Sequence, residues 1–339
     1  MPRRRRIRTV ALGVAAVLAA LALVTALAPS PASARGPKVA VCIAPTVRSG
    51  VEVNATVPKR TADILVRRTA SYLGVCASYG QSTKMGKGTI RAFSQSRNGV
   101  PDTIGLVMSD DALKGLPNHP PTAGLWCYDL NGDGKIDQHT ECTGGYEYPL
   151  QLSKQFRTRV DTPFQYVLMN WNPAGHMPEH IYDRPHFDVH FYMNSNEERL
   201  AIRPGPCGML VNCEDFEVGA KPIPARYMPA DYSDFGAVEP GMGNHLIDLT
   251  GPELNGEPFR HTFIYGSYGG RLTFYEPMIT EDWYRRVASG SEAGGCFPIK
   301  QPKAWQTAGW YPTRYCVRHR DNRSELVTTL EGFVHRKKG

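Results

Sequence analysis

The sequence lacks the short motifs that mark several common enzyme classes. It contains no G-x-S-x-G, G-x-G-x-x-G, P-loop or H-E-x-x-H pattern and no C-x-x-C pair. G-x-S-x-G carries the nucleophile of many hydrolases, and G-x-G-x-x-G and the P-loop bind nucleotides. H-E-x-x-H and C-x-x-C are typical zinc-binding patterns. Nucleotide cofactors and motif-based nucleophilic catalysis are therefore not expected.

Net positive charge is also scarce once the first residues are set aside. The chain has 39 basic and 32 acidic residues, but five of the arginines lie in residues 1–34, which contain no acidic residue. The remainder carries a net charge of only +2. A nearly neutral chain has little attraction for nucleic acid or an anionic membrane surface, and we expect neither as a partner.

Residues 1–34 have the organisation of a secretory signal peptide. Basic residues are followed by an apolar run over 10–28 and by the small residues Ala32, Ser33 and Ala34, which offer an A-x-A cleavage site. The alternative is a retained membrane anchor, because the apolar run is nearly long enough to span a bilayer. We predict cleavage, a secreted or extracytoplasmic protein, and no membrane association afterwards.

The cysteines fit an oxidising compartment, because their number is even and the chain carries an export signal. Eight cysteines allow 105 connectivities, so the choice of sequential pairing is a preference for short loops. The predicted disulfides are Cys42–Cys76, Cys127–Cys142, Cys207–Cys213 and Cys296–Cys316.

Short stretches rich in β-branched and aromatic residues predict a mainly β fold. They alternate between apolar and polar residues and are separated by turn residues, as in TIGLVMS, HFDVHFYM and RLTFYEPM. We expect an antiparallel sandwich or barrel-like architecture, with a jelly roll among the alternatives, and few short helices.

The strongest helix candidate runs from Lys59 to Tyr72, within an N-terminal extension at 35–83. The principal β-rich domain is predicted at 84–335. Residues 200–245, rich in proline, glycine and aspartate, are predicted to form a long loop braced by a disulfide.

The segment 127–142, CYDLNGDGKIDQHTEC, is similar to a calcium-binding EF-hand loop. Oxygen ligands are expected from Asp129, Asn131, Asp133, the Lys135 carbonyl, Asp137 and Glu141. The pattern departs from an EF-hand at its twelfth position, where threonine replaces the bidentate acid and the glutamate follows one residue later. The alternative is an ion-free surface turn, because Asp, Asn and Gly are common in such turns.

One predicted strand concentrates histidines. In the stretch HFDVHFYM, His186, Asp188 and His190 share one face, because successive strand residues point to opposite sides. Imidazole and carboxylate are the usual protein ligands of zinc, copper and non-haem iron. His186 and His190 are about 13 Å apart along a strand, so one ion would take Asp188 with one of them. The alternative is a polar network or ligand groove without metal.

Further ligands must come from distant segments. The candidates are His245, and His261 or Glu276 on a predicted hairpin. If Gly266 opposes Arg271, these last two face each other, whereas a one-residue change in the pairing puts them on opposite faces. His176 and His180 have the spacing of two helical ligands, but Pro178 lies between them, so they do not form a helical pair.

Four separated motifs resemble one bacterial family. They are PHFDVHFYM, GMGNHLIDLTGPELNGEPF, HTFIYGSYGGRLTFYEPMIT and GWYPTRYCV. The family is a group of exported, histidine-bearing proteins first described from a Thermus sigma-E-controlled gene and classed as a domain of unknown function. The resemblance runs from about Gly86 to Val334.

This resemblance implies a β-rich fold, secretion and homo-oligomer formation, but no particular reaction. It places the following residues in the recurrent motifs: His186, Asp188, His190, His245 and Glu276. The 127–142 loop looks like an inserted element of the family.

Two functions remain open at this point. The first is an exported, disulfide-stabilised metal-binding protein with a calcium-type loop and a His/Asp site for zinc, copper or iron. The second is a metal-dependent extracytoplasmic enzyme, a hydrolase or oxidoreductase that uses the strand from His186 to His190. The sequence favours neither a substrate nor a reaction.

Overall fold

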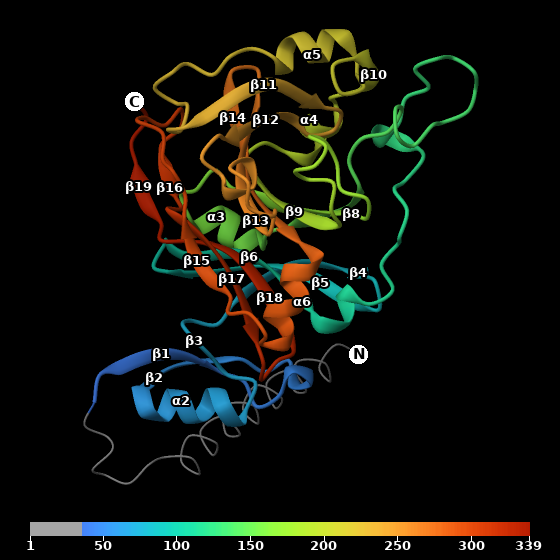
Figure 1. Cartoon of the computed structure of the whole chain (residues 1–339). Helices are drawn as coiled ribbons and strands as arrows, with labels where there is room; N and C mark the ends of the chain where they lie inside the picture. The colour runs from blue at the N-terminus through green and yellow to red at the C-terminus, as the bar shows by residue number, and fades with distance from the viewer. Residues whose placement is uncertain (1–35) are drawn as a thin grey trace, which may run out of the picture. The chain divides into compact units, whose positions relative to one another are not determined.

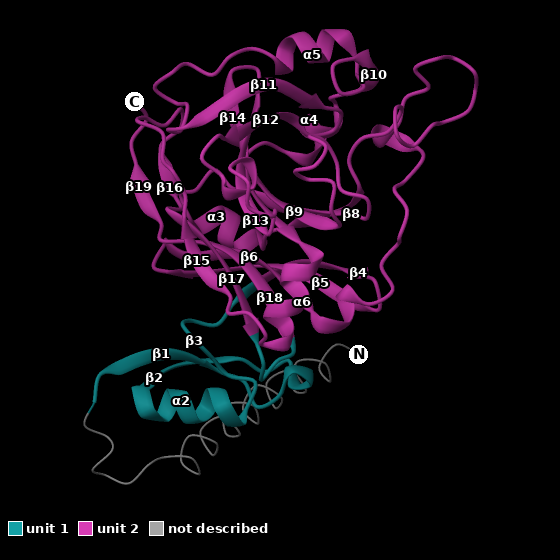
Figure 2. Cartoon of the chain, viewed as in Figure 1, with its two compact units in different colours: residues 1–78, 320–324 teal, residues 79–319, 325–339 magenta. Residues whose placement is uncertain are grey.

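The computed structural model describes residues 36–339, which form two compact units (Figures 1 and 2). Unit 1 comprises residues 36–78 and the short segment 320–324, and unit 2 comprises residues 79–319 and 325–339. The signal peptide predicted at 1–34 lies outside the described residues, and the domain boundary at 83/84 stays a prediction. Among the helices of the described chain, none is long and apolar enough to cross a membrane.

Unit 1 is a small three-stranded sheet with one helix packed on it. The strands are β1 (Lys38–Ile43), β2 (Val53–Pro58) and β3 (Tyr72–Leu73), and β1 pairs antiparallel with both others. Helix α2 (Lys59–Arg68) begins where the sequence predicts and ends four residues earlier, because Thr69 is already extended. The apolar residues of this small core are Val41, Ile43, Val57, Ala62 and Leu65.

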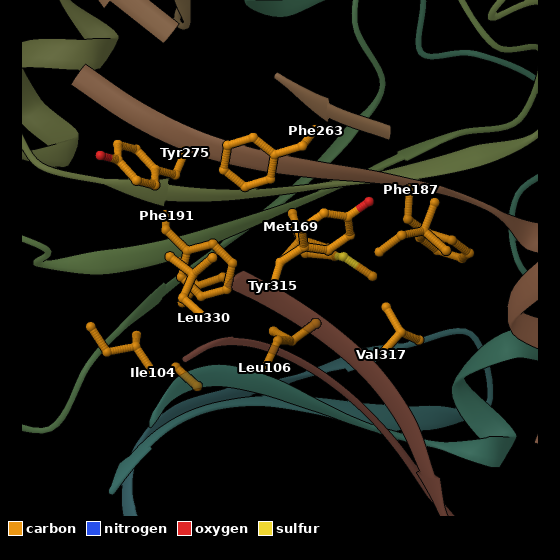
Figure 3. Close-up of a cluster of buried hydrophobic side chains, with 14 of the residues drawn as sticks. Ile104, Leu106, Met169, Phe187, Phe191, Phe263, Tyr275, Tyr315, Val317 and Leu330 are labelled. Atoms are coloured by element: carbon orange, nitrogen blue, oxygen red, sulfur yellow. The ribbon is translucent and has the colours of Figure 1, made fainter. Parts of the chain in front are cut away.

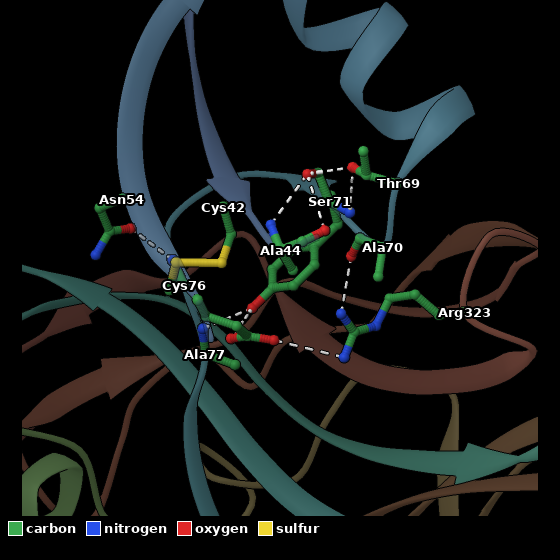
Figure 4. Close-up of a disulfide and its surroundings, with 11 residues drawn as sticks. Cys42, Ala44, Asn54, Thr69, Ala70, Ser71, Cys76, Ala77 and Arg323 are labelled. Atoms are coloured by element: carbon green, nitrogen blue, oxygen red, sulfur yellow. Dashed lines mark hydrogen bonds and ion pairs between the residues drawn. A yellow bond between two sulfur atoms is a disulfide. The ribbon is translucent and has the colours of Figure 1, made fainter. Parts of the chain in front are cut away.

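A disulfide and a buried arginine close unit 1 (Figure 4). The Cys42–Cys76 disulfide links β1 to the segment that follows β3. The Arg323 guanidinium donates to the Ala70 carbonyl at 2.8 Å and lies 3.4 Å from the Glu52 carboxylate. The segment 320–324, which contains Arg323, therefore belongs to unit 1 through specific polar contacts.

Unit 2 contains two large antiparallel sheets. The first has the strand order β11 (Tyr232–Glu239), β12 (Gly243–Asp248), β13 (His261–Tyr268), β14 (Arg271–Thr280), β9 (His186–Tyr192), β8 (Tyr166–Asn172), β7 (Tyr146–Gln151). The second has the order β15 (Gly295–Pro298), β17 (Arg314–Arg320), β18 (Glu325–Glu331), β6 (Val100–Ser109), β5 (Gly88–Arg97), β4 (Ser78–Met85). A further two-stranded sheet pairs β16 (Gly309–Tyr311) with β19 (Val334–Arg336). The mainly β prediction is confirmed.

The core of unit 2 lies between the two sheets (Figure 3). Buried side chains of the seven-stranded sheet include Met169, Phe187, Phe191, Phe263 and Tyr275. They pack against buried side chains of the six-stranded sheet that include Ile104, Leu106, Tyr315, Val317 and Leu330. Two sheets that share one apolar interior form a β sandwich, which is one of the architectures that the sequence predicts.

Short helices connect the strands. They are α3 (Lys154–Arg159), α4 (Asn196–Leu200), α5 (Cys213–Gly219) and α6 (Glu281–Ser289), with 3₁₀ turns η2 (Val47–Ser49), η3 (Asp110–Leu113), η4 (Gly124–Trp126) and η5 (Pro252–Leu254). Helix α6 follows directly from β14 because the Thr280 hydroxyl accepts the Trp283 N–H and caps its first turn.

The prediction of a long loop over 200–245 was wrong. This segment contains β10 (Pro204–Cys207), α5 and β11, and β12 begins at its end. The apolar residues that hold it, Ile202, Val211 and Val238, are separated in the sequence and form one buried cluster. The proline and glycine residues between them conceal this pattern.

All four predicted disulfides are confirmed. The structure pairs Cys42 with Cys76, Cys127 with Cys142, Cys207 with Cys213 and Cys296 with Cys316. No cysteine of the described chain is free. Such complete pairing is typical of proteins that fold in an oxidising compartment.

Candidate functional site

Strand β9 presents a row of buried polar side chains on the face of its sheet that points away from the sandwich core. Its apolar residues Phe187 and Phe191 lie in the core, as the alternation predicts. On the opposite face, His186 and His190 are fully buried and Asp188 is 4% exposed. The row is therefore enclosed by protein and does not face bulk water.

The neighbouring strand β8 adds two amides to this row. The antiparallel register places Asn172 beside His186 and Asn170 beside Asp188. Both asparagines are buried. The Asn172 Nδ2 group donates to Asp188 Oδ2 at 2.5 Å and so fixes one oxygen of that carboxylate.

A first cluster, the Asp188 group, consists of His176, His186 and Asp188. Its potential ligand atoms all lie within 4.8 Å of one another. Asp188 Oδ1 is 3.1 Å from His186 Nε2, and Asp188 Oδ2 is 3.6 Å from His176 Nε2. His176 comes from the loop after β8, and its side chain is 19% exposed. Two imidazoles and one carboxylate around one point form a common zinc or iron ligand set.

A second cluster, the Glu276 group, consists of His190, His245 and Glu276 from strands β9, β12 and β14. Its ligand atoms also lie within 4.8 Å of one another. His190 Nε2 is 3.4 Å from Glu276 Oε1, and His245 Nε2 is 3.9 Å from Glu276 Oε2. The same ligand set therefore occurs twice on one sheet face.

Backbone carbonyls orient three of these imidazoles. The Nδ1 atoms of His186, His176 and His245 lie 2.7, 2.8 and 3.0 Å from the carbonyls of Arg184, Met177 and Ala237. When Nδ1–H donates to a carbonyl, Nε2 is the ring nitrogen left to bind an ion. At His186 the ion would compete with the Asn172 amide, 3.3 Å from Nε2, and at His176, whose pKa is raised to about 9, it would displace a proton. In all three histidines this Nε2 atom faces a carboxylate. Metal-binding histidines are typically held by this type of hydrogen bond.

Several buried polar atoms of this face lack a hydrogen-bond partner within the described structure. They include both ring nitrogens of His190, both amide atoms of Asn170, Oδ1 of Asn172, Oδ1 of Asp188 and Oε2 of Glu276. Each unsatisfied buried polar group costs about 1–3 kcal/mol. A bound cation or polar ligand would satisfy such atoms.

Charge is distributed unevenly within the Asp188 group. Burial opposes ionisation of Asp188, but His186 and His176 beside it hold the pKa of this carboxyl well below its usual range. Burial likewise opposes the charge on His176, but Asp188 outweighs it and raises the pKa of His176 to about 9. The cluster thus contains a buried carboxylate anion, which attracts a proton or a metal cation.

In the Glu276 group, unlike the Asp188 group, burial favours the uncharged forms of the side chains. Burial, together with the negative charges of Asp188 and Glu239, raises the pKa of Glu276 well above its usual range. Burial lowers the pKa of His190 to about 3. Without a cation, both groups therefore favour their neutral forms.

The structure distributes the five predicted site residues over two clusters. His186 and Asp188 lie in one, and His190, His245 and Glu276 lie in the other. The expectation that one ion takes Asp188 with only one strand histidine agrees with this division.

One expectation about distant ligands needs correction, and one ligand was missed. The predicted register that opposed His261 to Glu276 was wrong, because the structure pairs Ile264 with Glu276 and His261 with Ile279. His261 instead packs against Trp283 and Phe297, away from the polar row. The missing ligand is His176, which the sequence indicated only through its spacing to His180, a pair that Pro178 excluded, and through its position shortly before β9.

The acidic loop at 129–141 is folded by its own side chains. Asp129 accepts the N–H groups of Gly132 and Gly134, each at 2.8 Å. Glu141 is 2% exposed. Its carboxylate accepts the N–H groups at positions 130, 131 and 137. Glu141 therefore holds the loop together, while the calcium ligands stay a prediction.

Two further clusters in the described chain contain cysteine and glutamate. They are Cys42, Glu52 and Cys76, and Cys296, Cys316 and Glu331. In both, the two sulfur atoms are joined in a disulfide and offer no thiolate. We therefore restrict the candidate metal centre to the two histidine clusters.

Comparisons with protein-family models, with curated proteins and with solved structures give no match.

Proposed function

We propose that this chain is an exported, disulfide-stabilised protein that binds a transition-metal ion at the Asp188 group, with zinc as the first candidate and copper or iron as alternatives. The observation that carries the proposal is the orientation of His176 and His186. Each is held through Nδ1 by a backbone carbonyl, and each directs Nε2 toward the same buried carboxylate. This arrangement fits a metal ion with nitrogen and oxygen ligands.

The spacing of the ligand atoms is compatible with such an ion. Ligands around a tetrahedral zinc with bonds of about 2.1 Å are about 3.4 Å apart. Asp188 Oδ1 and His186 Nε2 are 3.1 Å apart, and Asp188 Oδ2 and His176 Nε2 are 3.6 Å apart. Only small side-chain movements would complete the site.

Metal analysis of protein purified without added ions, and again after zinc loading and dialysis, tests the proposal. We expect retained zinc in the wild type and loss of the ion of the Asp188 group in His186→Gln and Asp188→Asn. The matched control is His180→Gln, because His180 lies in the same loop as His176 but its side chain is 92% exposed. Retention of no transition metal by the wild type, or of unchanged metal by both site variants, would overturn the proposal. Circular dichroism verifies that each variant is folded.

A metal-dependent hydrolase or oxidoreductase is the second candidate, because three protein ligands leave coordination positions for water or substrate. His176 provides the observation in its favour, since its partial exposure gives access from the loop side. The complete burial of His186 and the packing of Phe259 on its ring leave little space for a substrate. A binding role is therefore the better-supported proposal.

We further propose that the loop at 129–141 binds calcium. Support comes from the alternating oxygen residues, the tight turn at Gly134, and the Cys127–Cys142 disulfide that closes the loop. We expect calcium, but not magnesium, to raise the melting temperature of the wild type. Asp133→Ala should abolish this shift, and substitution of the exposed Glu257 by glutamine should preserve it. An equal calcium shift in the wild type and Asp133→Ala would exclude the loop as the site.

Secretion, homo-oligomer formation and membership of the sigma-E-associated family also stay proposals. Their support is the leader at 1–34 and the four motifs quoted above. The complete set of disulfides is compatible with export.

A further inference from the structure

We infer that the outer face of the seven-stranded sheet is a two-ion site, in which the Glu276 group holds a second transition-metal ion beside the first. This inference rests on the proposed metal binding at the Asp188 group and extends it from one ion to a pair. It is carried by the geometry of His190, His245 and Glu276.

Three strands place the ligands of the second ion. In β9, His190 is fully buried; in β14, Glu276 is 1% exposed. The side chain of His245 from β12 is 12% exposed. Its Nδ1 donates to the Ala237 carbonyl at 3.0 Å, which leaves Nε2 free to bind an ion. The group thus combines rigid buried ligands with one edge through which an ion can enter.

The contacts inside this group do not replace an ion. His190 Nε2 and Glu276 Oε1 are 3.4 Å apart, and His245 Nε2 and Glu276 Oε2 are 3.9 Å apart. Both separations exceed those of good hydrogen bonds between nitrogen and oxygen. Within the described structure, neither ring nitrogen of His190 has a hydrogen-bond partner, nor does Oε2 of Glu276. His190 Nε2 and Glu276 Oε2 belong to the same ligand set, so a cation bound there would satisfy both atoms.

One ion cannot serve both groups. His186 and His190 are four residues apart on one strand, a separation of about 13 Å, and each metal–nitrogen bond is only about 2 Å long. Asp188 and His190 occupy successive positions on the same face, about 7 Å apart. Two ions would therefore lie side by side along β9, close enough for the unpaired electrons of two Cu²⁺ ions to interact.

Apolar side chains enclose the second group. Tyr166, Leu168, Tyr192 and Phe274 form a buried cluster on this face. The Phe274 ring centroid is 4.8 Å from that of His190 and 5.3 Å from that of His245. It can occupy this position because Gly266 on the adjacent strand has no side chain, and a Cβ there would collide with the ring. Such an environment strengthens ion–ligand interactions by excluding water.

Zinc stoichiometry tests the inference. We expect two ions per chain in the zinc-loaded wild type and in the His180→Gln control. His186→Gln should retain one ion through the Glu276 group, His245→Gln should retain one through the Asp188 group, and the double variant should retain none. Two ions in His245→Gln, or one ion in the wild type, would overturn the pair. If the wild type binds one ion and only His186→Gln loses it, the proposed metal binding at the Asp188 group stands and the second ion is excluded. A wild type without any zinc would overturn both.

Electron paramagnetic resonance of copper-loaded protein supplies a second readout. Two Cu²⁺ ions held at successive same-face positions of β9, which are about 7 Å apart along the strand, should give dipolar broadening and a half-field signal. Both features should disappear in His186→Gln and in His245→Gln, although each variant still binds one ion. Isolated Cu²⁺ spectra from a wild type that holds two ions would exclude adjacent sites.

Discussion

A single amide fixes the carboxylate at the centre of the Asp188 group. Asn172 Nδ2 donates to Asp188 Oδ2 at 2.5 Å and lies 3.3 Å from His186 Nε2. Because Asn172 is 1% exposed, no water can easily replace this hydrogen bond. Asn172 is therefore a positioning residue for the proposed metal ion.

Replacement of Asn172 by alanine tests this role. We expect zinc affinity at the Asp188 group to fall about 10- to 100-fold, because the carboxylate loses the hydrogen bond that orients it. Competition titration with a chromophoric chelator measures the affinity. The exposed Asn118→Ala is the control and should bind zinc as the wild type does. An unchanged affinity in Asn172→Ala would show that Asp188 is oriented by other groups.

His261 shows how differently one residue type behaves on the other side of the sheet. Its ring lies 4.4 Å from Trp283 and 4.1 Å from Phe297, and Nδ1 is 2.8 Å from the Tyr315 hydroxyl. Burial, aided by the nearby Arg260 charge, lowers the pKa of His261 to about 4. This histidine is therefore neutral and structural.

The depressed pKa of His261 predicts acid sensitivity. The unfolded chain, with a histidine pKa of about 6.5, binds the proton more readily than the folded chain between about pH 6.5 and pH 4. The contribution to stability is complete above about pH 6.5 and decreases as the pH falls to about 4, by at most about 3 kcal/mol.

Urea unfolding at several pH values checks this prediction. The pH dependence in this window should be smaller in His261→Gln than in the wild type. The exposed His180→Gln should keep the wild-type dependence. If the free energy of unfolding depends on pH in the same way in the wild type and in His261→Gln, burial does not lower the pKa of His261 as we propose.

The sequence predicted part of the site at this scale. Alternation in HFDVHFY placed His186, Asp188 and His190 on one face, because the two-residue period of a strand is local. It did not distinguish exposure from burial, which depends on the segments that cover the sheet. The hairpin register was wrong for His261 because the chain turns at Gly269 and Gly270, so Tyr268 and not Gly266 opposes Arg271. A bulge between Gly266 and Ser267 then shifts the pairing by one further residue.

At the scale of elements, a buried arginine holds helix α4 against strand β7. Arg199 is 1% exposed, and its two terminal nitrogens contact the Glu147 carboxylate at 2.8 and 2.9 Å. It also donates to the Gly241 carbonyl at 2.5 Å. One five-residue helix, one strand and one turn thus depend on a single guanidinium.

Arg199→Ala should destabilise unit 2 by about 3–5 kcal/mol, because it leaves a carboxylate unpaired in a nearly buried position. Thermal or urea denaturation measures the loss. Arg203→Ala is the matched control, since Arg203 pairs with Asp215 but its side chain is 53% exposed. The control should lose much less stability. Similar losses in both variants would show that burial of Arg199 has no special effect.

The segment from 200 to 245 explains why element prediction failed there. A strand or helix is visible in a sequence when its apolar residues recur at a regular spacing. Here the helix is only seven residues long, and Ile202, Val211 and Val238 reach one cluster from separate elements. This region is therefore held by contacts between residues that are distant in the sequence.

On the scale of the whole molecule, disulfides stabilise each unit within itself. Cys42–Cys76 closes a sequence separation of 34 residues in unit 1, and Cys207–Cys213 closes only 6 residues in unit 2. A longer closed loop removes more conformational entropy from the unfolded chain.

Removal of the two disulfides should therefore have unequal effects. We expect the free energy of unfolding to fall by about 1.5 kcal/mol more in the double variant Cys42→Ser, Cys76→Ser than in Cys207→Ser, Cys213→Ser. This difference comes from the effect of loop length on the entropy of the unfolded chain. In the Cys42→Ser, Cys76→Ser variant, backbone amides of unit 1 should lose protection from hydrogen exchange, and the zinc content should stay unchanged. Loss of zinc together with unit 1 protection would contradict the assignment of the metal centre to unit 2.

The sequence by itself determined the mainly β class, the start of helix α2 and the shared face of His186, Asp188 and His190, and a preference for short loops selected the correct disulfide pairing among 105. These follow from local periodicity and short closed loops, which need no knowledge of distant segments. Only the tertiary structure decided that this face is buried, that His176 joins Asp188, and that His245 and Glu276 join His190. Strand order and register bring these residues together, and both depend on long-range packing that no local pattern encodes.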